Sequence, residues 1–339
     1  MPRTAVVVAL LLLSLPSDAA TRVSEKQHRH TRHARTKAEA VIDATAVNDP
    51  GLTKTIGPGS SGTAALRAQI LLARAHFSCG EIDARYGANL RGAIADFQTA
   101  HGLDGSGVVE AGTWKILNAD TAPALVRAAI APEDVAGPFA PVPEDMMEKA
   151  KLPALSYSSP LEAIAEKYHA SPALMQKLNP GSGFDRAGEE ILVPNVTVPP
   201  PEKAASVAVS KSRRRVMALD ASGKILSSYP ATIGSEHDPL PIGKWKILGV
   251  SQNPPFHYNP DLFWNAKSSD GKATIAPGPN NPVGVAWIDL SKEHYGIHGS
   301  PEPSQIGKTQ SHGCIRLTNW DVTELSKMVG PGTPAILEE

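Results

Sequence analysis

Cysteine is scarce in this chain, since only Cys79 and Cys314 occur among 339 residues. Two cysteines exclude a disulfide-stapled scaffold and any zinc site built from four thiolates. The 33 Lys and Arg residues are matched by 34 Asp and Glu residues, so the formal net charge is −1. Nucleic-acid binding requires an excess of positive charge, and we therefore predict no nucleic-acid partner. Whether the two cysteines pair, or one of them is a working thiol, stays open at this point.

Long apolar runs are missing beyond the N-terminus. Residues 5–15 are apolar apart from Ser14, Arg3 precedes them, and small residues lead up to Ala19. This run is too short to cross a hydrocarbon core of ~30 Å as a helix. The three-part pattern is typical of a secretory signal peptide over residues 1–19. The sequence thus predicts an exported protein of the periplasm or cell wall, with no membrane span in its mature form.

Proline is plentiful, with 30 residues, and it concentrates in two stretches that have no helical or strand periodicity and are predicted to be linkers. A basic, histidine-rich stretch after the signal peptide is predicted to be disordered, because it has no apolar periodicity. The predicted order is a signal peptide (1–19), a disordered basic His-rich tail (20–57), a helical module (58–118), a Pro/Ala linker (119–149), a small module (150–195), a Pro-rich linker (196–203) and a catalytic module (204–338).

The first module has apolar residues at helical spacing over 66–73 and 90–97, and a third short helix is expected near Trp114. Together with Phe97-Gln98 and the 101–103 stretch, this pattern resembles the peptidoglycan-binding domain of wall hydrolases. The resemblance implies a three-helix domain. In so small a domain Cys79 is expected to be a partly buried structural residue.

The second module resembles a LysM domain, through apolar residues over 161–168, the run Leu174-x3-Leu178-Asn-Pro-Gly and a closing strand over 191–193. The resemblance implies a small α+β domain that holds N-acetylglucosamine-containing glycans. A structural spacer without carbohydrate affinity is the alternative.

From Ser206 onward the pattern changes to short β runs separated by glycine and proline turns, with one helix near 322–328 and a closing strand over 333–337. A mainly β domain is predicted. Within it, His298-Gly299 and the Ser311–Arg316 segment concentrate reactive groups.

A cysteine nucleophile reacts as the thiolate, and its ordinary pKa of ~8.5 calls for a neighbouring base or positive charge. His298 has the chemistry to take that proton and return it to a leaving amine. The backbone N–H groups near Gly313 and Cys314 are candidate oxyanion donors, and Arg316 is suited to a substrate carboxylate. A metal site built from Cys314, His312 and His298 lacks a further ligand at a recognisable spacing. A serine hydrolase lacks the Gly-x-Ser-x-Gly elbow. Residue types alone leave cysteine acyl transfer and chance proximity both open.

The stretch 273–319, which contains Tyr295-Gly-Ile-His-Gly299 and Ser311-His-Gly-Cys-Ile-Arg-Leu317, resembles a YkuD-type L,D-transpeptidase catalytic domain. The resemblance implies that Cys314 is the nucleophile and His298 the proton donor and acceptor, with the imidazole oriented by the carbonyl of Gly299 or a neighbour. The site residues expected by this resemblance are catalytic Cys314, His298, His312, Gly313 and Gly299, and substrate-binding Arg316 and Ser311.

The family reaction implied is acyl transfer on peptidoglycan stems, with no metal and no organic cofactor. The thiol attacks the diaminopimelate carbonyl of a tetrapeptide, D-alanine leaves, and an amine accepts the acyl group. That amine belongs to a second stem peptide, a lipoprotein lysine or a free D-amino acid. Two alternatives are hydrolysis at the same site, as in an L,D-carboxypeptidase or a lipoprotein-releasing enzyme, and a non-catalytic wall-binding protein.

Overall fold

The computed structural model describes residues 42–199 and 201–339, so the predicted signal peptide and residues 20–41 of the tail lie outside the described residues. The helices are α1 (Ala44–Val47), α2 (Thr63–Arg74), α3 (Ala88–Ala100), α4 (Ala111–Leu117), α5 (Met146–Lys149), α6 (Pro160–Lys167), α7 (Pro172–Leu178) and α8 (Asn319–Met328). The strands are β1 (Leu125–Ala129), β2 (Glu190–Pro194), β3 (Ser206–Ser210), β4 (Arg215–Leu219), β5 (Ile225–Pro230), β6 (Thr232–Ile233), β7 (Gly243–Gln252), β8 (Phe256–Tyr258), β9 (Ala273–Ile275), β10 (Ala286–Leu290), β11 (Gly296–His298), β12 (Ile315–Arg316) and β13 (Pro334–Glu338).

Three helices, α2, α3 and α4, form the first module as the apolar spacing predicted. The end of the predicted tail is also folded, which corrects the expectation of disorder for residues 42–57. Val47 on α1 and Ile56 are both fully buried in the core of this module, and Ile56 pairs with Val109 in an isolated bridge. Burial of these two apolar side chains offsets the entropy of ordering this short segment.

The second module consists of α6 and α7 between the antiparallel strands β1 and β2, with Leu125 opposite Pro194 and Ala129 opposite Glu190. Each helix begins with a serine cap followed by proline, a sequence that starts helices efficiently. Strand β1, a 3-10 helix at Pro132–Val135 and α5 all lie in residues 119–149. The prediction that this stretch is an unstructured linker is therefore wrong: the five residues of β1 are ordered by their ladder to β2, which the sequence does not show locally.

The two N-terminal modules share one apolar core rather than two separate ones. Between them Ile82 forms a parallel bridge with Ala170, its amide donating to the carbonyl of His169 (2.8 Å) and its carbonyl accepting from Ser171 (3.0 Å). Both bridge residues are buried. Because removing either module would expose this core to water, the two modules stabilise each other.

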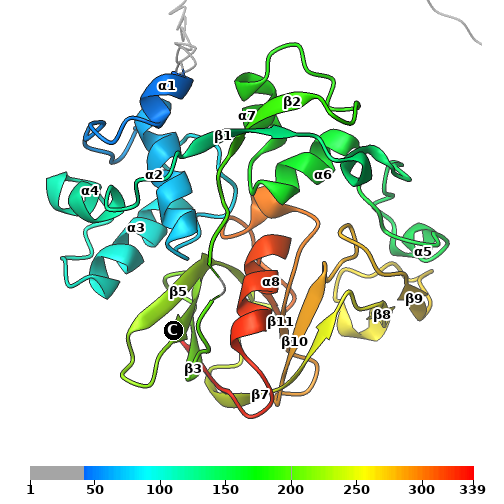
Figure 1. Cartoon of the computed structure of the whole chain (residues 1–339). Coiled ribbons are helices and arrows are strands. Elements are labelled where there is room, and N and C mark those ends of the chain that lie inside the picture. The colour runs from blue at the N-terminus through cyan, green and yellow to red at the C-terminus, as the bar shows by residue number, and fades with distance from the viewer. Residues whose placement is uncertain (1–41, 200) are drawn as a thin grey trace, which may run out of the picture. The chain divides into compact units, whose positions relative to one another are not determined.

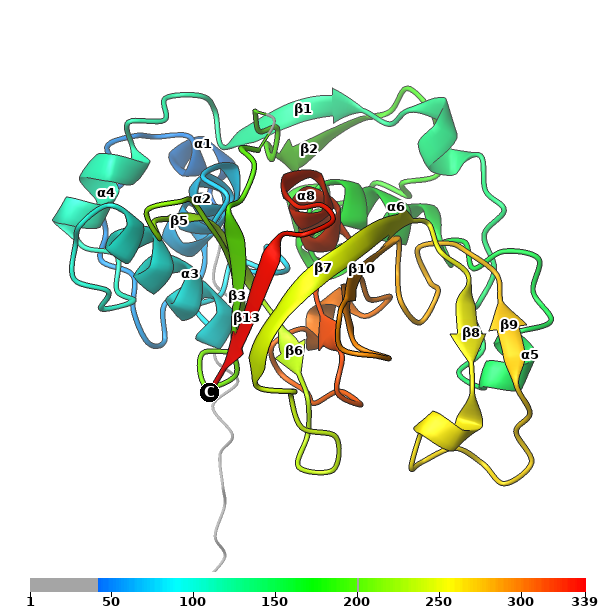
Figure 2. The ribbon, with the colours of Figure 1, turned by 90° about the horizontal axis from the view of Figure 1, so that it is seen from below.

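The third module is built on a nine-stranded sheet in the order β5-β4-β3-β13-β7-β10-β11-β12-β6. The pairs β3–β13 and β11–β12 are parallel and the other neighbouring pairs are antiparallel. Helix α8 contacts β10 and β11, and in both ribbon views it lies beside α6 of the second module (Figures 1 and 2). This helix therefore joins the second module to the strand that ends in His298.

The first module is bonded directly to this sheet. The amide of Ser78 donates to the carbonyl of Ser228 on β5 (2.8 Å), and the Ser228 amide donates to the carbonyl of His76 (3.0 Å). Asp96 of α3 and Arg215 of β4, both buried, form an ion pair across the same contact. Residues 40–339 form one compact unit, so the modules are packed together instead of being separated by linkers.

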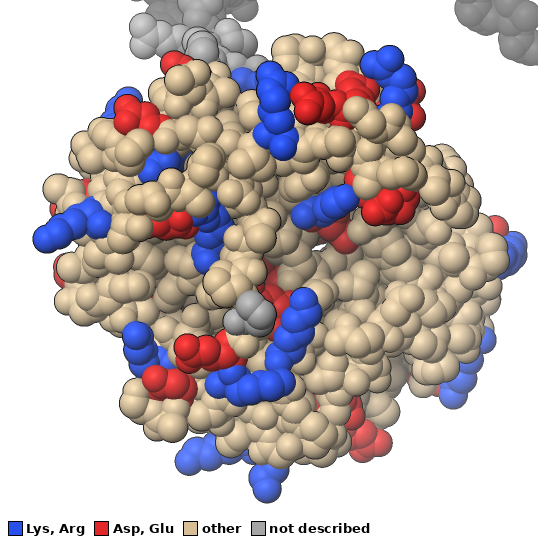
Figure 3. All heavy atoms as spheres, in the orientation of Figure 1, with Lys and Arg blue, Asp and Glu red and all other residues tan. Residues whose placement is uncertain are grey.

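Charge is evenly mixed on the face drawn in Figure 3, where Lys and Arg are interspersed with Asp and Glu. This face shows no large patch of one sign, which agrees with the near-zero net charge. No helix within residues 42–199 and 201–339 is long and apolar enough to cross a membrane.

Candidate active site

The parallel pairing of β11 with β12 brings the two principal predicted residues onto neighbouring strands. Ile297 lies opposite Ile315 and His298 lies opposite Arg316, while Cys314 directly precedes β12. The amide of Leu317 donates to the carbonyl of His298 (2.8 Å) and continues the ladder. Two segments that are sixteen residues apart in sequence thus lie on neighbouring strands.

Cys314 is half-buried, and its thiol is not in a disulfide. Its Sγ is 3.6 Å from the carbonyl oxygen of His294. Burial raises the pKa of this thiol, and a hydrogen bond from the backbone of Gly296 and the charge of Arg316 lower it by less. The thiol is therefore protonated at neutral pH, and a base is required to generate the thiolate.

The turn before the thiol is held by two features. Ser311, which is buried, donates its hydroxyl to the carbonyl of Cys314 at 2.5 Å. Gly313 has φ +97°, and a Cβ built there lies 2.8 Å from Cε1 of Tyr295. Glycine is required at this position because both the left-handed backbone and the tyrosine ring exclude a side chain.

His298 is 4% exposed and stacks on Trp287, with ring centroids 5.3 Å apart and planes 16° apart. Its Nδ1 is 2.7 Å from the carbonyl oxygen of Gly299. A carbonyl can only accept, so Nδ1 carries the hydrogen and Nε2 is the basic nitrogen of the neutral ring. This is the orienting contact expected from the resemblance. Burial, aided by the charge of Arg316, lowers the pKa of His298 to about 3.

Arg316 is a half-buried cation near the thiol. Burial lowers the pKa of its guanidinium, and the neighbouring Cys314 and Glu302 oppose that shift. Its Nε–H is buried and donates to no acceptor within the described part of the chain. An unsatisfied buried donor on a cation is a favourable place for an anionic oxygen of a ligand.

His312 is enclosed by a loop that sequence reasoning missed. Phe263 and Trp264 lie 5.2 and 5.7 Å from its ring centroid, and Asn265 Oδ1 accepts from its Nε2 at 2.9 Å. Trp264 is 62% exposed and also stacks on His237 at 5.1 Å. An available signal was the adjacent Phe263-Trp264 pair in a chain with only 5% aromatic residues.

This loop is anchored by the start of the second module and by the end of the predicted linker, whose Val142, Met146 and Met147 pack against the same apolar cluster. The loop connects β8 and β9, whose buried residues Tyr258 and Ile275 pack against Leu155. The amide of Leu155 donates to the carbonyl of Pro277 at 2.9 Å. The stretch between the first two modules therefore supports the aromatic side of the site.

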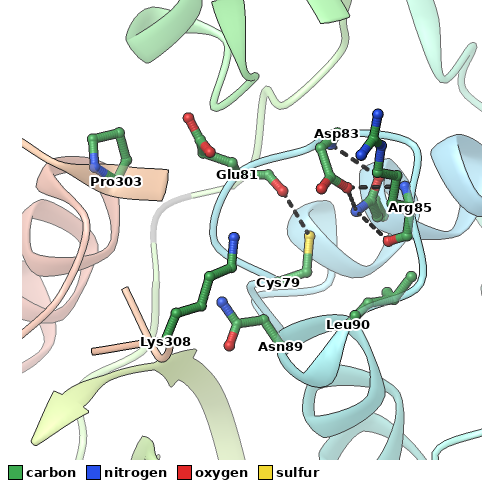
Figure 4. Close-up of a pocket in the computed structure, with 10 residues that line it drawn as sticks. Cys79, Glu81, Asp83, Arg85, Asn89, Leu90, Pro303 and Lys308 are labelled. Carbon is green, nitrogen blue, oxygen red and sulfur yellow. Dashed lines mark hydrogen bonds between the residues drawn. The ribbon is translucent and has the colours of Figure 1, made fainter. Parts of the chain in front are cut away.

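Cys79 lies in the first module, away from these strands, and is 4% exposed and unpaired. Burial raises the pKa of its thiol far above the ordinary value. It lines a small cavity of about 30 Å³. Figure 4 shows its side chain there together with those of Glu81, Asp83 and Lys308. Its burial agrees with the structural role expected of it.

Within residues 42–199 and 201–339, no group of three or more His, Cys, Asp and Glu side chains is placed to hold a metal ion. The tail residues His28, His30 and His33 lie outside the described residues.

Comparison with known proteins places the chain in a family. The profile of the L,D-transpeptidase catalytic domain matches residues 204–337. The protein named "Putative L,D-transpeptidase YkuD" of Bacillus licheniformis is 32% identical over 179 residues, which are 51% of this chain and 90% of that protein. The chain belongs to the L,D-transpeptidase family. The protein of the same name in Bacillus subtilis is 30% identical over 178 residues, with the same coverage.

This membership confirms the resemblance drawn from residues 273–319, and the chain is an enzyme of the L,D-transpeptidase type. The profile described as "Putative peptidoglycan binding domain" matches residues 61–117, which are the α2–α4 module. Among solved structures, the L,D-transpeptidase from Xylanimonas cellulosilytica aligns over 85% of this chain and all of that one, with 16% identity and a TM-score of 0.36. The likeness of the second module to LysM stays a prediction.

Proposed function

We propose that this L,D-transpeptidase is exported to the cell wall and remodels peptidoglycan by acyl transfer through Cys314. The observation that carries the proposal is the pairing of β11 with β12, which sets His298, with its basic Nε2, on the strand next to the one that Cys314 directly precedes. A catalytic cysteine next to an oriented histidine is the arrangement required for covalent acyl transfer.

The reaction begins from a neutral pair, because burial raises the pKa of the thiol and lowers that of the imidazole. As Sγ attacks the diaminopimelate carbonyl of a tetrapeptide stem, His298 Nε2 takes the thiol proton. The backbone N–H groups of Gly313 and Cys314 stabilise the oxyanion. The C–N bond to D-alanine then breaks, and the leaving amine takes the proton from His298. A thioester on Cys314 remains.

The second half repeats these steps in reverse. An acceptor amine attacks the thioester carbonyl and gives its proton to His298; the C–S bond then breaks, and the leaving thiolate takes that proton from the imidazolium. In this scheme the unsatisfied Nε–H of Arg316 binds a carboxylate of the stem peptide, His312 shapes the acyl pocket, and Ser311 fixes the turn. The acceptor proposed is a second stem peptide, which gives a 3–3 crosslink, a lipoprotein lysine or a free D-amino acid. With water as acceptor the same site is hydrolytic.

The N-terminal modules are proposed to hold wall polymer close to the thiol, which raises its local concentration. The match of residues 61–117 to a peptidoglycan-binding profile supports this for the first module. The two-strand, two-helix arrangement of the second module supports the predicted LysM-like domain and a glycan ligand. The packing of both modules against the catalytic sheet favours a fixed arrangement over a flexible tether.

The test is incubation of the full chain with purified tetrapeptide muropeptides, followed by mass spectrometry of the products. Release of D-alanine and formation of dimers are expected for the wild type and for Cys79→Ala, which changes the thiol remote from the site. Cys314→Ala is expected to give neither product, and full activity of that variant refutes the nucleophile assignment. Addition of a D-amino acid distinguishes transfer from hydrolysis, because exchange products appear only when an amine competes with water. Sacculus binding without any turnover by the wild type favours the non-catalytic wall-binding alternative.

A further inference from the structure

One buried amide connects the second module to the backbone around the catalytic imidazole. Asn319 begins α8 and is 2% exposed. Its Nδ2 donates to Glu166 Oε1 of α6 (3.1 Å) and to the carbonyl of Pro279 (3.1 Å), while its Oδ1 accepts from the amide of Val285 (3.2 Å). Both ends of this side chain are therefore held, one of them by a residue of another module.

The inner end of Asn319, its Oδ1, contacts the Gly299 peptide, whose carbonyl orients the His298 imidazole. A Cβ built on Gly299 lies 2.3 Å from Asn319 Oδ1, so this oxygen packs directly against the Gly299 backbone. The carbonyl of the same glycine accepts the hydrogen bond from His298 Nδ1 at 2.7 Å. A displacement of Asn319 would therefore move the group that fixes the tautomer and the plane of the imidazole.

The outer end of Asn319 is bonded to the carboxyl group of Glu166, which is itself held in place. Tyr157 donates its hydroxyl to Glu166 Oε1 at 2.8 Å. Burial raises the pKa of Glu166 to about 7, and its hydrogen bonds from Tyr157 and Asn319 act in the opposite direction. Desolvating a carboxyl group without a full counter-charge costs free energy. Packing alone therefore does not explain why a glutamate occupies this position, whereas its hydrogen bond from Asn319 does.

We propose that Glu166 is a positioning residue for the catalytic histidine: through Asn319 it fixes the Gly299 carbonyl and hence the imidazole of His298. The second module is then part of the acyl-transfer machinery and not only an accessory for wall binding. This inference rests on the proposed role of His298 as the base.

The test compares four variants of the full chain. Glu166→Leu removes the acceptor, Glu166→Asp withdraws it by one methylene, and Glu166→Gln keeps an acceptor oxygen at the same reach. Glu190→Leu alters an exposed carboxyl on β2 of the same module and is the matched control. The measured quantity is the rate at which a carbapenem acylates Cys314 at pH 7, followed by intact mass.

The expected result is a loss of about tenfold for Glu166→Leu and Glu166→Asp, since a displaced general base loses part of its contribution. Glu166→Gln and Glu190→Leu are expected to stay near the wild-type rate. Alkylation by iodoacetamide at pH 10 uses the preformed thiolate and needs no base, so all four variants should then react alike. An equal loss at pH 7 and pH 10 would mean general damage to the site and would overturn the proposal, as would a wild-type rate for Glu166→Leu.

A second measurement separates this proposal from the proposed function. Ring ¹⁵N signals of His298, assigned with the His298→Gln variant, report the tautomer without any turnover. The Nδ1–H form is expected in the wild type and a mixture of tautomers in Glu166→Leu; an unchanged tautomer overturns the inference. If the wild type fails to be acylated, the proposed function fails while these spectra still decide the role of Glu166. If Glu166→Leu does not fold, Glu166→Asp supplies the decisive comparison.

Discussion

Replacing Asp96 by alanine should loosen the contact between the first module and the catalytic sheet. Asp96 on α3 is fully buried, and its Oδ2 lies 2.5 Å from Arg215 Nε. It also forms an ion pair with Arg213 and accepts a hydrogen bond from Ser228. The variant removes the only one of these four side chains that carries negative charge.

The expected loss of stability follows from the partners that Arg215 keeps in the variant. Arg215 is 2% exposed and keeps hydrogen bonds to Ser78 O (3.0 Å) and Ser228 Oγ (2.8 Å), neither of which carries charge. Burial lowers the pKa of Arg215 to about 9, so desolvation of the guanidinium is already costly with the carboxylate present. Removing one partner of a buried ion pair costs about 3–5 kcal/mol. For a protein of this size, with an unfolding entropy of about 2.1 cal/mol/K per residue, that corresponds to a fall in melting temperature of about 4–8 °C.

The assay is thermal unfolding at pH 7.5 by circular dichroism or calorimetry. Asp104→Ala, an exposed aspartate of the same module, is the control and should melt within about 1–2 °C of the wild type. The double variant Asp96→Leu/Arg215→Met replaces the pair by apolar groups and should recover most of the loss. The reasoning is refuted if Asp96→Ala melts together with the control, or if the double variant is less stable than Asp96→Ala.

Three further results are expected. Gly313→Ala should lower carbapenem acylation of the thiol at least about tenfold, because its Cβ would lie 2.8 Å from Tyr295 Cε1 in a left-handed backbone; a wild-type acylation rate contradicts this. Iodoacetamide labelling of native Cys314 should rise with pH, with a midpoint above the ordinary pKa of ~8.5 because burial raises the thiol pKa. Cys79 should be labelled only when the protein unfolds. A labelling midpoint near pH 6 for Cys314 would instead indicate a preformed thiolate–imidazolium pair. His298 has its folded pKa lowered to about 3, so between pH 6.5 and 3 only the unfolded state binds this proton and acidification destabilises the fold by up to about 1.4 kcal/mol per pH unit. Urea unfolding at pH 7 and pH 5 should therefore show a smaller loss on acidification for His298→Gln than for the wild type, and equal losses argue against the shift.

Local patterns were sufficient for much of the catalytic domain. The short β runs from Ser206 onward predicted a mainly β domain, and the helix near 322–328 and the closing strand over 333–337 were placed within a few residues of α8 and β13. The Ser311–Leu317 motif predicts Cys314 as the nucleophile because its residue types and order are specific. Parallel pairing of two very short strands, which brings His298 next to this motif, has no local signal of its own.

Contacts between modules could not be predicted, for a physical reason. Asp96, Arg215 and Glu166 are charged residues, and charged residues are usually solvated, so each was indistinguishable from a surface position in the sequence. Their burial depends on partners more than a hundred residues away. The same holds for β1, whose order depends on β2. The proline content therefore predicted a linker over residues 119–149, where the folded chain has a strand and two short helices. The strand is ordered by its pairing with the distant β2.

The ion pair between Asp96 and Arg215 also bears on the order in which the chain assembles. Synthesis delivers Asp96 long before Arg215, and until β4 is made the carboxylate of α3 has no cation to face. The newly made first module therefore keeps that side hydrated, and docking waits for the catalytic sheet. The thiol follows later still, and β13, the strand between β3 and β7, is made after it, so the sheet and the site are completed together at the very end of synthesis.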